Sequence, residues 1–385
     1  MRIGILTMNY HRNYGGILQC VALQNTLEKM GYEVEVIRFQ AMDKGWFRRK
    51  IKVLFSGLPV SVIGKYLYDI MKDFIASLVG KRKPISMQLL GKCKLFIDAN
   101  IRYTELCNED TIGSLLIKHR LDVLVIGSDK IWGELAREQL VYMGDFKPRF
   151  QGKILSYAAC TSFPFIPSYN KEKIHQLLLD FTAISVRDDY TRNLFRCYTD
   201  LDMKVVLDPT LLYDFQPYLV RKNEEPYIFT YILGREIKGG HKLMIEQIRK
   251  KYGNIKIKAI VLSDESTDIV PYVDEMIDDA DPSEWLNAVY NASFIYTDSF
   301  HGIIFSLKFK KPFVAYYTEA SRATRLIDLR ERFHLDNVIV TSSREALVKD
   351  SINQMIDYGS IYNVLNEMQK YSQSFLQDSI GGNHY

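Results

Sequence analysis

Short apolar runs alternate along most of the chain with segments whose apolar residues recur at helical spacing. Residues 2–8 have the pattern of a buried strand, residues 15–31 have helical spacing and end at a glycine, and residues 32–39 form a second apolar run. A strand, a glycine turn, a helix and a second strand make the βαβ unit of a parallel sheet. The opening residues therefore predict an α/β fold.

The same pattern continues in two series. In the first series we expect buried strands within residues 121–128, 152–160, 183–189 and 203–209. In the second series we expect strands within residues 227–233, 255–263, 293–299 and 311–317. Helical patterns lie between these strands, and the tail from Ser343 to Ile380 is almost entirely helical in pattern.

The length of the chain, 385 residues, favours two domains, because single cores stop growing beyond about 250–300 residues. Prolines and charged residues without periodicity separate the two series. We therefore predict two Rossmann-like domains that face a cleft, with a helical insertion in the first. The predicted divisions are an N-terminal domain over 1–210 with its insertion at about 44–100, a linker over 211–226, a C-terminal domain over 227–360 and a helical tail over 361–385.

Positive charge is concentrated in the predicted insertion. The net charge of the chain is +4, but ten basic residues between Lys44 and Lys83 face only two acidic ones, Asp69 and Asp73. Apolar and basic residues interleaved at helical spacing can lie on an anionic membrane surface. The other interpretation is an ordinary helical insertion with a solvated basic face, or one that docks a partner protein. Nucleic-acid binding is disfavoured, because the charge comes without a recognised fold or aromatic platform.

The rest of the composition indicates the cellular compartment and argues against two kinds of site. The sequence has no run of about 20 apolar residues, and its opening run is too short for the core of a signal peptide. We therefore expect a cytoplasmic protein, with the basic segment 44–83 as the candidate for peripheral contact at the inner face of the membrane. The five cysteines are scattered and form no CxxC pair, so we expect neither a zinc site nor a redox motif.

Two of the loops that follow strands in the first series carry candidate ligand-binding residues, because ligands of parallel sheets bind beyond the carboxyl ends of the strands. Asn13, Gly15 and Gly16 precede a predicted helix, where backbone N–H groups can approach an anion or a sugar, although a tight turn explains them equally well. Asp129 ends a strand and can accept sugar hydroxyls or act as a base, or it can simply cap the next helix.

Two further loops carry cations. Arg187 ends a strand and offers a bidentate fork for a carboxylate or phosphate, unless it forms an internal salt bridge. The candidate salt-bridge partners, between which local spacing cannot choose, are Asp188, Asp189 and Asp208.

His301 lies where a strand turns into a helix, beside the cap-type residues Asp298 and Ser299. An imidazole that faces a cleft can accept or donate a proton near pH 7. Downstream, Arg322 and Arg325 follow the next strand and can face the same cleft.

Six sequence pieces, in order, resemble the polysaccharide pyruvyl transferase family. They are "NYGGILQ", "VIGSDKIW", "SYAAC", "SVRDDYT", "VLDPTLL" and "DSFHGIIFSLKFKKPFVAY", and they span residues 1 to about 330. The resemblance implies transfer of a pyruvyl group from phosphoenolpyruvate to two hydroxyls of a sugar, which gives a cyclic ketal in surface polysaccharide biosynthesis. It also implies a fold similar to the GT-B glycosyltransferases, with the acceptor on the N-terminal domain and the donor on the C-terminal domain.

The resemblance also assigns roles to residues. It implies that His301 is the catalytic acid or base, and that Arg187, Ser299 and a downstream arginine, Arg322 or Arg325, hold phosphoenolpyruvate. The implied acceptor-binding residues are Asn13, Gly15, Gly16, Gln19 and Asp129. Phosphoenolpyruvate is expected as a co-substrate, with no other cofactor and no metal.

This chain departs from the family pattern in two of the pieces. Many family members have Arg-Leu-His where this chain has Ser-Phe-His, so Phe300 stands near a missing cation. In the second piece, Lys130 and Gly133 replace the Gln and Asn that many members carry.

Two other functions fit the same architecture. One is a glycosyltransferase that uses a nucleotide-sugar, for which residues 263–267 could supply a carboxylate to the ribose. The other is a non-catalytic scaffold of polysaccharide assembly.

Overall fold

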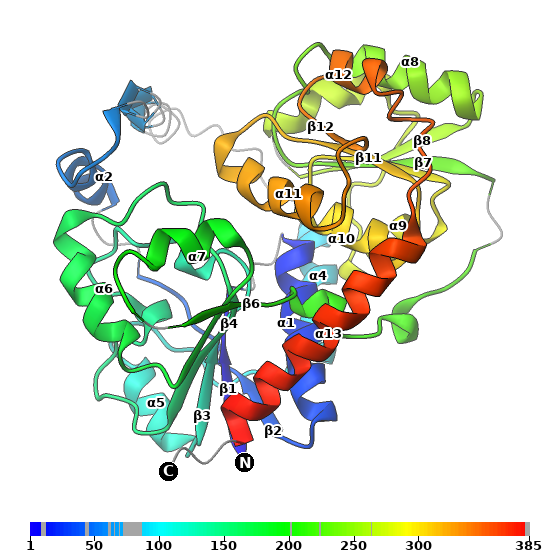
Figure 1. Cartoon of the computed structure of the whole chain (residues 1–385). Coiled ribbons are helices and arrows are strands. Elements are labelled where there is room, and N and C mark those ends of the chain that lie inside the picture. The colour runs from blue at the N-terminus through cyan, green and yellow to red at the C-terminus, as the bar shows by residue number, and fades with distance from the viewer. Residues whose placement is uncertain are drawn as a thin grey trace.

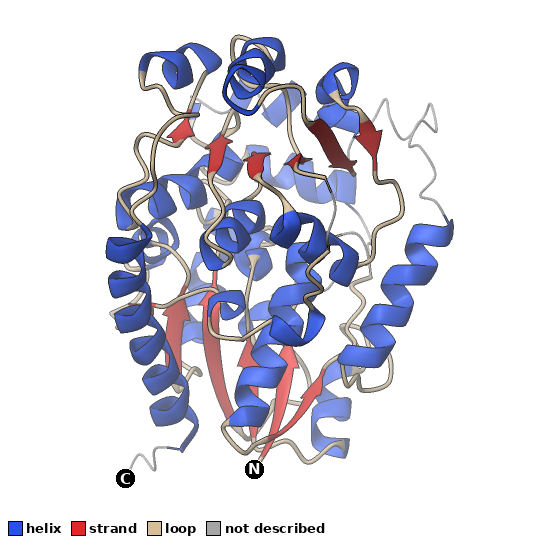
Figure 2. Ribbon diagram, turned by 90° about the vertical axis from the view of Figure 1, so that its right-hand side faces the viewer, coloured by secondary structure: helices blue, strands red, loops and turns tan. Residues whose placement is uncertain are grey.

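The computed structural model describes residues 1–8, 13–42, 46–60, 63–64, 66–68, 70–71, 87–200, 202–222, 225–262 and 264–381. Within these residues the chain forms two α/β domains, of which the N-terminal one lies below the C-terminal one in Figure 1. Each domain is built on a six-stranded parallel sheet, and helices lie on both faces of the sheets (Figure 2). The predicted fold class is therefore confirmed.

The N-terminal sheet has the strand order β2-β1-β3-β4-β5-β6. Its strands are β1 (Arg2–Leu6), β2 (Glu33–Val36), β3 (Val123–Ile126), β4 (Lys153–Ala159), β5 (Ala183–Val186) and β6 (Met203–Val205). The helices of this domain are α1 (Tyr14–Lys29), α5 (Ile112–Lys118), α6 (Lys171–Leu178) and α7 (Asp189–Phe195). Because helices cover both faces, central strands are buried along their whole length, as β3 is, and this burial explains their continuous apolar pattern.

The C-terminal sheet has the strand order β12-β11-β10-β7-β8-β9. Its strands are β7 (Tyr227–Ile232), β8 (Lys256–Val261), β9 (Glu275–Met276), β10 (Phe294–Thr297), β11 (Phe313–Tyr316) and β12 (Ile339–Val340). Its helices are α8 (His241–Tyr252), α9 (Pro282–Asn291), α10 (Phe300–Lys308), α11 (Ala320–Arg332) and α12 (Ser343–Val348). The sequence pattern missed β9 and β12, because an edge strand of two residues is too short to leave a periodic signal.

The strand orders place the predicted loops at the points where the sheet topology reverses. In the N-terminal sheet β1 lies between β2 and β3, and in the C-terminal sheet β7 lies between β8 and β10. Crevices beyond the strand ends at such reversal points are the usual ligand sites of open α/β sheets. The loops before α1 and after β3 meet at the first point, and the loops after β7 and β10 meet at the second.

The two domains share one hydrophobic core. Tyr14 of α1 stacks on Trp285 of α9 with ring centroids 5.7 Å apart, and its hydroxyl donates to the backbone oxygen of Ala280 at 2.8 Å. The predicted linker is also packed, since Phe215 meets Phe305 of α10 edge to face at 5.2 Å. The relative position of the domains is therefore fixed by buried aromatic residues and not only by surface contacts.

The predicted insertion over 44–100 contains two described helices of different character. α4 (Met87–Asn100) buries four apolar residues in the shared core and reaches α9, where Lys92 forms an ion pair with Glu284. α2 (Trp46–Leu54) stands out at the edge of the N-terminal domain (Figure 1). Residues 43–45, 61–62, 65, 69 and 72–86 of the predicted insertion lie outside the described residues.

The prediction of one almost continuous helical tail is wrong at residues 349–357, which form turns and loop between α12 and α13 (Tyr358–Gly381). Asp350, whose φ of 51° is incompatible with a continuing helix, lies just after α12. α13 then runs down to the N-terminal domain (Figure 1), where Ser372 accepts from the backbone N–H of Leu207 at 3.0 Å. The predicted end of the C-terminal domain, residue 360, thus falls within this helix.

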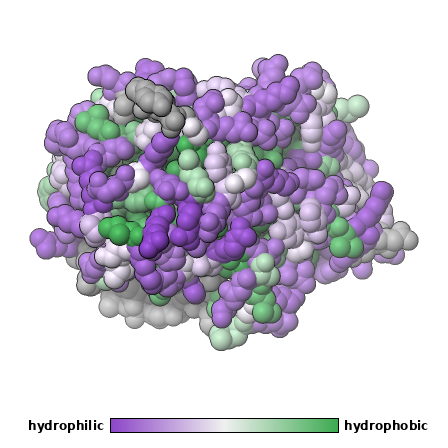
Figure 3. Space-filling view, turned by 90° about the horizontal axis from the view of Figure 1, so that it is seen from below, coloured by the Kyte–Doolittle hydropathy of each residue, from purple (hydrophilic) through white to green (hydrophobic). Residues whose placement is uncertain are grey.

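The surface seen from below is mainly hydrophilic, with small and separated hydrophobic patches (Figure 3). No helix in the described ranges is long and apolar enough to cross a membrane.

Candidate active site

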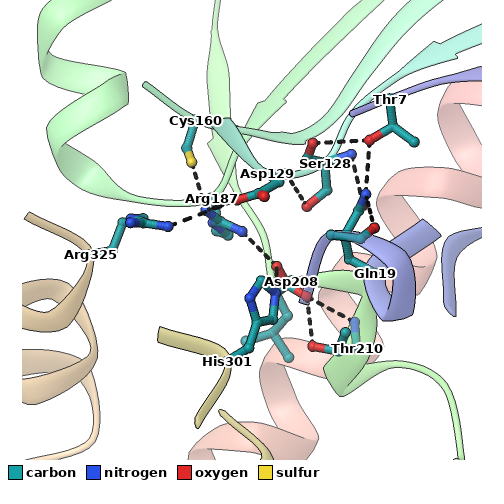
Figure 4. Close-up of polar contacts among 12 residues, drawn as sticks. Thr7, Gln19, Ser128, Asp129, Cys160, Arg187, Asp208, Thr210, His301 and Arg325 are labelled. Atoms are coloured by element: carbon teal, nitrogen blue, oxygen red, sulfur yellow. Dashed lines mark hydrogen bonds and ion pairs between the residues drawn. The ribbon is translucent and has the colours of Figure 1, made fainter. Parts of the chain in front are cut away.

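Charged side chains from both domains meet where the strands of the two sheets end (Figure 4). The N-terminal domain contributes Asp129 after β3, Arg187 after β5 and Asp208 after β6, and the C-terminal domain contributes His301 from α10 and Arg325 from α11. Each of the five residues is at most 9% exposed. Because buried charges are costly unless they are paired, their arrangement needs a physical explanation.

Arg187 is the centre of this cluster. One guanidinium nitrogen, Nη1, donates to Asp208 Oδ2 at 2.7 Å, and the other, Nη2, donates to Asp129 Oδ1 at 3.0 Å. Nη2 also lies 2.8 Å from Cys160 Sγ. Burial opposes the charge on Arg187, but the neighbouring thiol and carboxylates outweigh it and raise its pKa well above the usual range. The fork therefore links two strand ends of the same sheet.

Asp208 connects Arg187 with the histidine of the other domain. His301 Nε2 lies 3.6 Å from Asp208 Oδ2, and the other carboxylate oxygen accepts from the backbone N–H and the hydroxyl of Thr210 at 3.0 and 2.6 Å. Burial would raise the pKa of Asp208, but the neighbouring His301 imidazole, the charge of Arg187 and the Thr210 hydroxyl lower it below the usual range. Asp208 therefore stays ionised between Arg187 of its own domain and His301 of the other domain.

Gly15 makes room for the ring of His301. A Cβ atom built on Gly15 would lie 1.9 Å from His301 Nδ1 and 2.3 Å from its Cγ. This glycine belongs to the first turn of α1, and the histidine belongs to the first turn of α10 in the other domain. The absence of a side chain at position 15 is thus what allows the imidazole to lie against the N-terminal domain.

Asp129 has a strained backbone at the end of β3. Its φ of 67° with ψ of −163° lies in a region that is essentially restricted to glycine, and such conformations persist where surrounding contacts enforce them. The Oδ1 atom of Asp129 lies 3.0 Å from Arg187 Nη2 and 3.8 Å from Arg325 Nη1. Burial opposes ionisation of this carboxyl, but Arg187, His301 and Arg325 lower its pKa to about 2. Asp129 is therefore a buried anion between two arginines.

The ring of Phe300 lies close to both of these arginines. The guanidinium carbons of Arg187 and Arg325 lie 4.4 and 5.6 Å from the centroid of its ring. Burial, together with the charge of Arg187, lowers the pKa of Arg325. A phenyl face attracts cations, so the ring offsets part of the repulsion between the arginines.

A small cavity lies between the domains beside this cluster, and it leaves only about 10 Å³ for the centre of a water molecule. Its polar and charged lining residues are Arg187, Asp188, Asp208, Arg325, Asp328 and Arg332. Asp328 accepts from Arg332 at 2.7 Å and from the backbone N–H of Asp189 at 3.3 Å, so it links α11 to α7. This volume holds about one water, so a larger ligand requires the domains or these side chains to move.

The sequence of the chain was compared with models of protein families. Residues 13–319 match the model for polysaccharide pyruvyl transferase. The chain belongs to this family. The match covers most of the chain and contains four of the five clustered residues. Arg325 lies just beyond it.

Solved structures of low sequence identity are similar to this polysaccharide pyruvyl transferase family member. UDP-GlcNAc 2-epimerase from Neisseria meningitidis, bound to UDP-GlcNAc, is similar with a TM-score of 0.50 at 12% identity, and the alignment covers 100% of each chain. The lipopolysaccharide outer core galactosyltransferase WaaB has a TM-score of 0.48 at 10% identity, with 99% of each chain covered. MurG from Acinetobacter baumannii has a TM-score of 0.43 at 10% identity, with 99% of each chain covered. These neighbours are GT-B fold proteins. A search of curated protein sequences found no match.

The structure gives different positions to the residues predicted to hold the donor. Arg187 and Arg325 lie in the cluster. Ser299 is buried and is the N-cap of α10, where its hydroxyl accepts from the backbone N–H of Gly302 at 3.3 Å. The side chain of Arg322 lies outside the described part of the chain. Arg325 is therefore the predicted downstream arginine that the described structure brings to His301.

The residues predicted to bind the acceptor lie next to the cluster and have clear structural roles. Asn13 is the N-cap of α1, accepts from Gly16 at 3.1 Å and lies 3.5 Å from Asp129 Oδ2. Gln19 is fully buried; it donates to Thr7 Oγ1 at 2.9 Å and accepts from the backbone N–H of Ser128 at 3.2 Å. Gln19 thus holds the loop that carries Asp129 rather than facing a cavity.

Sequence reasoning missed one member of the cluster, Asp208, and its neighbour Cys160. Asp208 was considered only as a salt-bridge partner of Arg187, although its position directly after a strand was a signal that could have found it. Cys160 also follows a strand, but burial raises the pKa of its thiol to about 12, which leaves it unreactive. Among the described residues, no group of three or more His, Cys, Asp or Glu side chains is arranged to hold a metal ion.

Proposed function

We propose that this protein transfers the pyruvyl group of phosphoenolpyruvate to two hydroxyls of one sugar unit, which yields a cyclic pyruvate ketal and inorganic phosphate. The observation that carries the proposal is the meeting of His301 with Arg187 and Arg325 at a buried interface between two domains, in a chain of the polysaccharide pyruvyl transferase family. A small anionic donor needs at least two cations, and ketal formation needs a proton donor beside them.

The donor would bind by exchange with Asp129. In the present arrangement, the carboxylate of Asp129 lies between Arg187 and Arg325, at 3.0 and 3.8 Å from their nitrogens. A carboxylate or phosphate of phosphoenolpyruvate offers the same fork-shaped partner to both guanidinium groups. The strained backbone of Asp129 favours its release from this position. Once displaced, Asp129 would accept a hydrogen bond from an acceptor hydroxyl on the N-terminal side of the site.

The transfer needs two bonds to form at one carbon. A sugar hydroxyl oxygen attacks C2 of phosphoenolpyruvate while His301 gives a proton to the C3 methylene, which becomes a methyl group. The second hydroxyl then bonds to C2 as the C2–O bond to phosphate breaks. Of the two hydroxyl protons released, one restores His301 and the other leaves with inorganic phosphate. Arg187 and Arg325 stabilise the charge of the departing phosphate, and Asp208 keeps the imidazole oriented.

The first test is donor binding measured by thermal shift, because a ligand that binds the folded state raises its melting temperature by mass action. Phosphoenolpyruvate is expected to stabilise the wild type, and Arg325→Gln should lose that shift. Arg330→Gln on the same helix is the matched control, because Arg330 contacts Tyr317 and Asp336 instead of the cluster. Stabilisation by UDP-sugars and not by phosphoenolpyruvate would instead support a nucleotide-sugar-dependent glycosyltransferase, and stabilisation by neither would support a non-catalytic scaffold.

The second test is turnover, measured as phosphate release from phosphoenolpyruvate in the presence of a panel of free, nucleotide-linked and lipid-linked hexoses. His301→Asn should retain the thermal shift with phosphoenolpyruvate but lose at least a factor of about 100 in turnover, the usual contribution of a general acid or base. A His301→Asn variant that releases phosphate at the wild-type rate would refute the assigned role.

A further inference from the structure

α2 and the turns after it expose an unusual number of apolar side chains. Of the 18 exposed large hydrophobic residues in the described part of the chain, six fall between residues 51 and 71. They are Ile51, Phe55, Val60, Leu67, Tyr68 and Met71. Phe55 and Val60 are each 85% exposed, although single exposed apolar residues elsewhere are common and need no explanation. A group of this density marks a surface that contacts something apolar.

The same segment is anchored to the domain by its other side. Val53 and Leu58 are buried against Phe165 in a small cluster of their own. The backbone oxygen of Ser56 accepts from the N–H of Ser168 at 2.9 Å, and Lys52 Nζ lies 4.0 Å from the centroid of the Tyr169 ring. These contacts fix which side of α2 faces the protein. The apolar residues on the opposite side are therefore exposed to solvent on an anchored helix.

Cations accompany the exposed apolar residues. Residues 48, 49, 50 and 52 are all basic, and α2 contains no acidic residue. Arg48, Arg49 and Lys52 line a groove of about 360 Å³ together with residues 136–139, in which Arg137 already pairs with Glu109 and Glu134. The groove therefore has an excess of positive charge directly beside the exposed apolar side chains.

We propose that α2 and the described residues that follow it, 55–60, 63–64, 66–68 and 70–71, dock the protein on a membrane surface that contains anionic phospholipid. Phe55, Val60 and Tyr68 would enter the boundary between headgroups and acyl chains, and the cations of α2 and the groove would contact headgroup phosphates. A water-soluble partner would not require apolar and basic groups to alternate in this way, whereas a charged bilayer offers both kinds of contact within one interface. A bound bilayer would lie beside the loop that continues from Asp129, and would thus bring a membrane-held acceptor to the acceptor side of the site.

Flotation of the full-length protein on a sucrose gradient tests the proposal. The wild type is expected to float with vesicles of phosphatidylcholine and phosphatidylglycerol, to float much less with phosphatidylcholine alone, and to be released by salt, which screens charge. Each cation near an anionic surface strengthens partitioning roughly fivefold, so Arg48→Gln should weaken it about fivefold. Phe55→Ser with Val60→Ser should weaken it at least about tenfold.

Matched controls are available on the C-terminal domain. Val348 and Met355 are 80% and 95% exposed, so Val348→Ser with Met355→Ser removes as much exposed apolar surface elsewhere. Lys242→Gln removes one exposed cation of α8. Both controls are expected to float like the wild type, and thermal melts verify that every variant is folded.

Failure of the wild type to float with anionic vesicles would overturn the proposal, as would equal losses in the α2 variants and the controls. A dimer that Phe55→Ser with Val60→Ser converts to a monomer, without flotation, would overturn it in favour of a second copy of the chain. The proposal does not rest on pyruvyl transfer, because flotation reports binding and phosphate release reports catalysis.

Discussion

The packing of the His301 ring against Gly15, across the two domains, gives the sharpest prediction. In Gly15→Ala the new Cβ would lie 1.9 Å from Nδ1 of the ring, whereas unstrained carbon contacts are about 3.5–4.0 Å. The ring must therefore retreat by roughly 1.5 Å or the domains must separate by a similar distance. His301 has little room to do so, because it is 6% exposed and its ring lies 5.1 Å from that of Phe300.

The size of the effect follows from two opposing terms. Overpacking a buried contact costs about 1–3 kcal/mol, while alanine is favoured over glycine within a helix by up to about 1 kcal/mol. We therefore expect Gly15→Ala to lower the free energy of unfolding by about 1–2 kcal/mol. Turnover should fall by about 100-fold, since a displacement of about 1 Å at a reacting group has that effect.

Urea denaturation and the phosphate-release assay measure these two quantities. Gly91→Ala in α4 is the control for helix propensity, because nothing lies within 4 Å of its added Cβ, and it should be neutral or stabilising. His301→Ala in the Gly15→Ala background removes the ring that the methyl group meets. Gly15→Ala should therefore lower the free energy of unfolding much less in the His301→Ala background than in the wild type.

Two results would refute this reasoning. One is a Gly15→Ala protein with wild-type stability and turnover. The other is strict additivity of Gly15→Ala and His301→Ala in unfolding free energy, because additivity means that the two positions do not touch.

Further predictions concern the charges of the interface. Arg187→Met should lower the free energy of unfolding by about 3–5 kcal/mol in urea denaturation, because it leaves Asp129 and Asp208 buried without their partner; a loss below about 1 kcal/mol would contradict the buried pairing. The pKa values of Asp129 and Asp208 are lower in the folded protein than the unfolded-state value of about 4, so these carboxylates stabilise the fold above about pH 4. This stabilisation should be lost as the pH falls, through about 2 for Asp129, and acid unfolding measures the loss. Burial raises the pKa of Asp328 to about 6, so ionised Asp328 destabilises the fold. The free energy of unfolding should therefore rise as the pH falls from about 6 to about 4, and Asp328→Asn should remove this pH dependence. An unchanged slope in Asp328→Asn would show that another group titrates there.

The closed cluster has a consequence for how substrates enter. His301, Arg325 and Asp328 belong to the C-terminal domain, and their partners Asp208, Asp129 and the N–H of Asp189 belong to the N-terminal domain. The site is therefore held shut by ion pairs and hydrogen bonds between its own residues. An anionic donor that replaces Asp129 would break one of these links as it binds, which couples donor binding to a rearrangement of the interface.

The sequence by itself determined the local features of this protein. Buried parallel strands read as continuous apolar runs, so nearly every strand longer than two residues was predictable, and so were the loops at their ends. His301 was recognisable because a strand end, a cap residue and a helix are adjacent in the sequence. The tail was less predictable, because the turn at Asp350 depends on backbone geometry that the helical pattern does not encode.

Only the tertiary structure decided which charges meet. Local spacing left Asp188, Asp189 and Asp208 as equal candidates to pair with Arg187, but Asp188 caps α7 and the partners are Asp208 and Asp129, 21 and 58 residues away. Gly15 was predicted as a place where backbone approaches a ligand, and only the structure shows that its backbone also lies against His301 of the other domain. Strand order and domain docking set these distances, and both depend on contacts far apart in the chain.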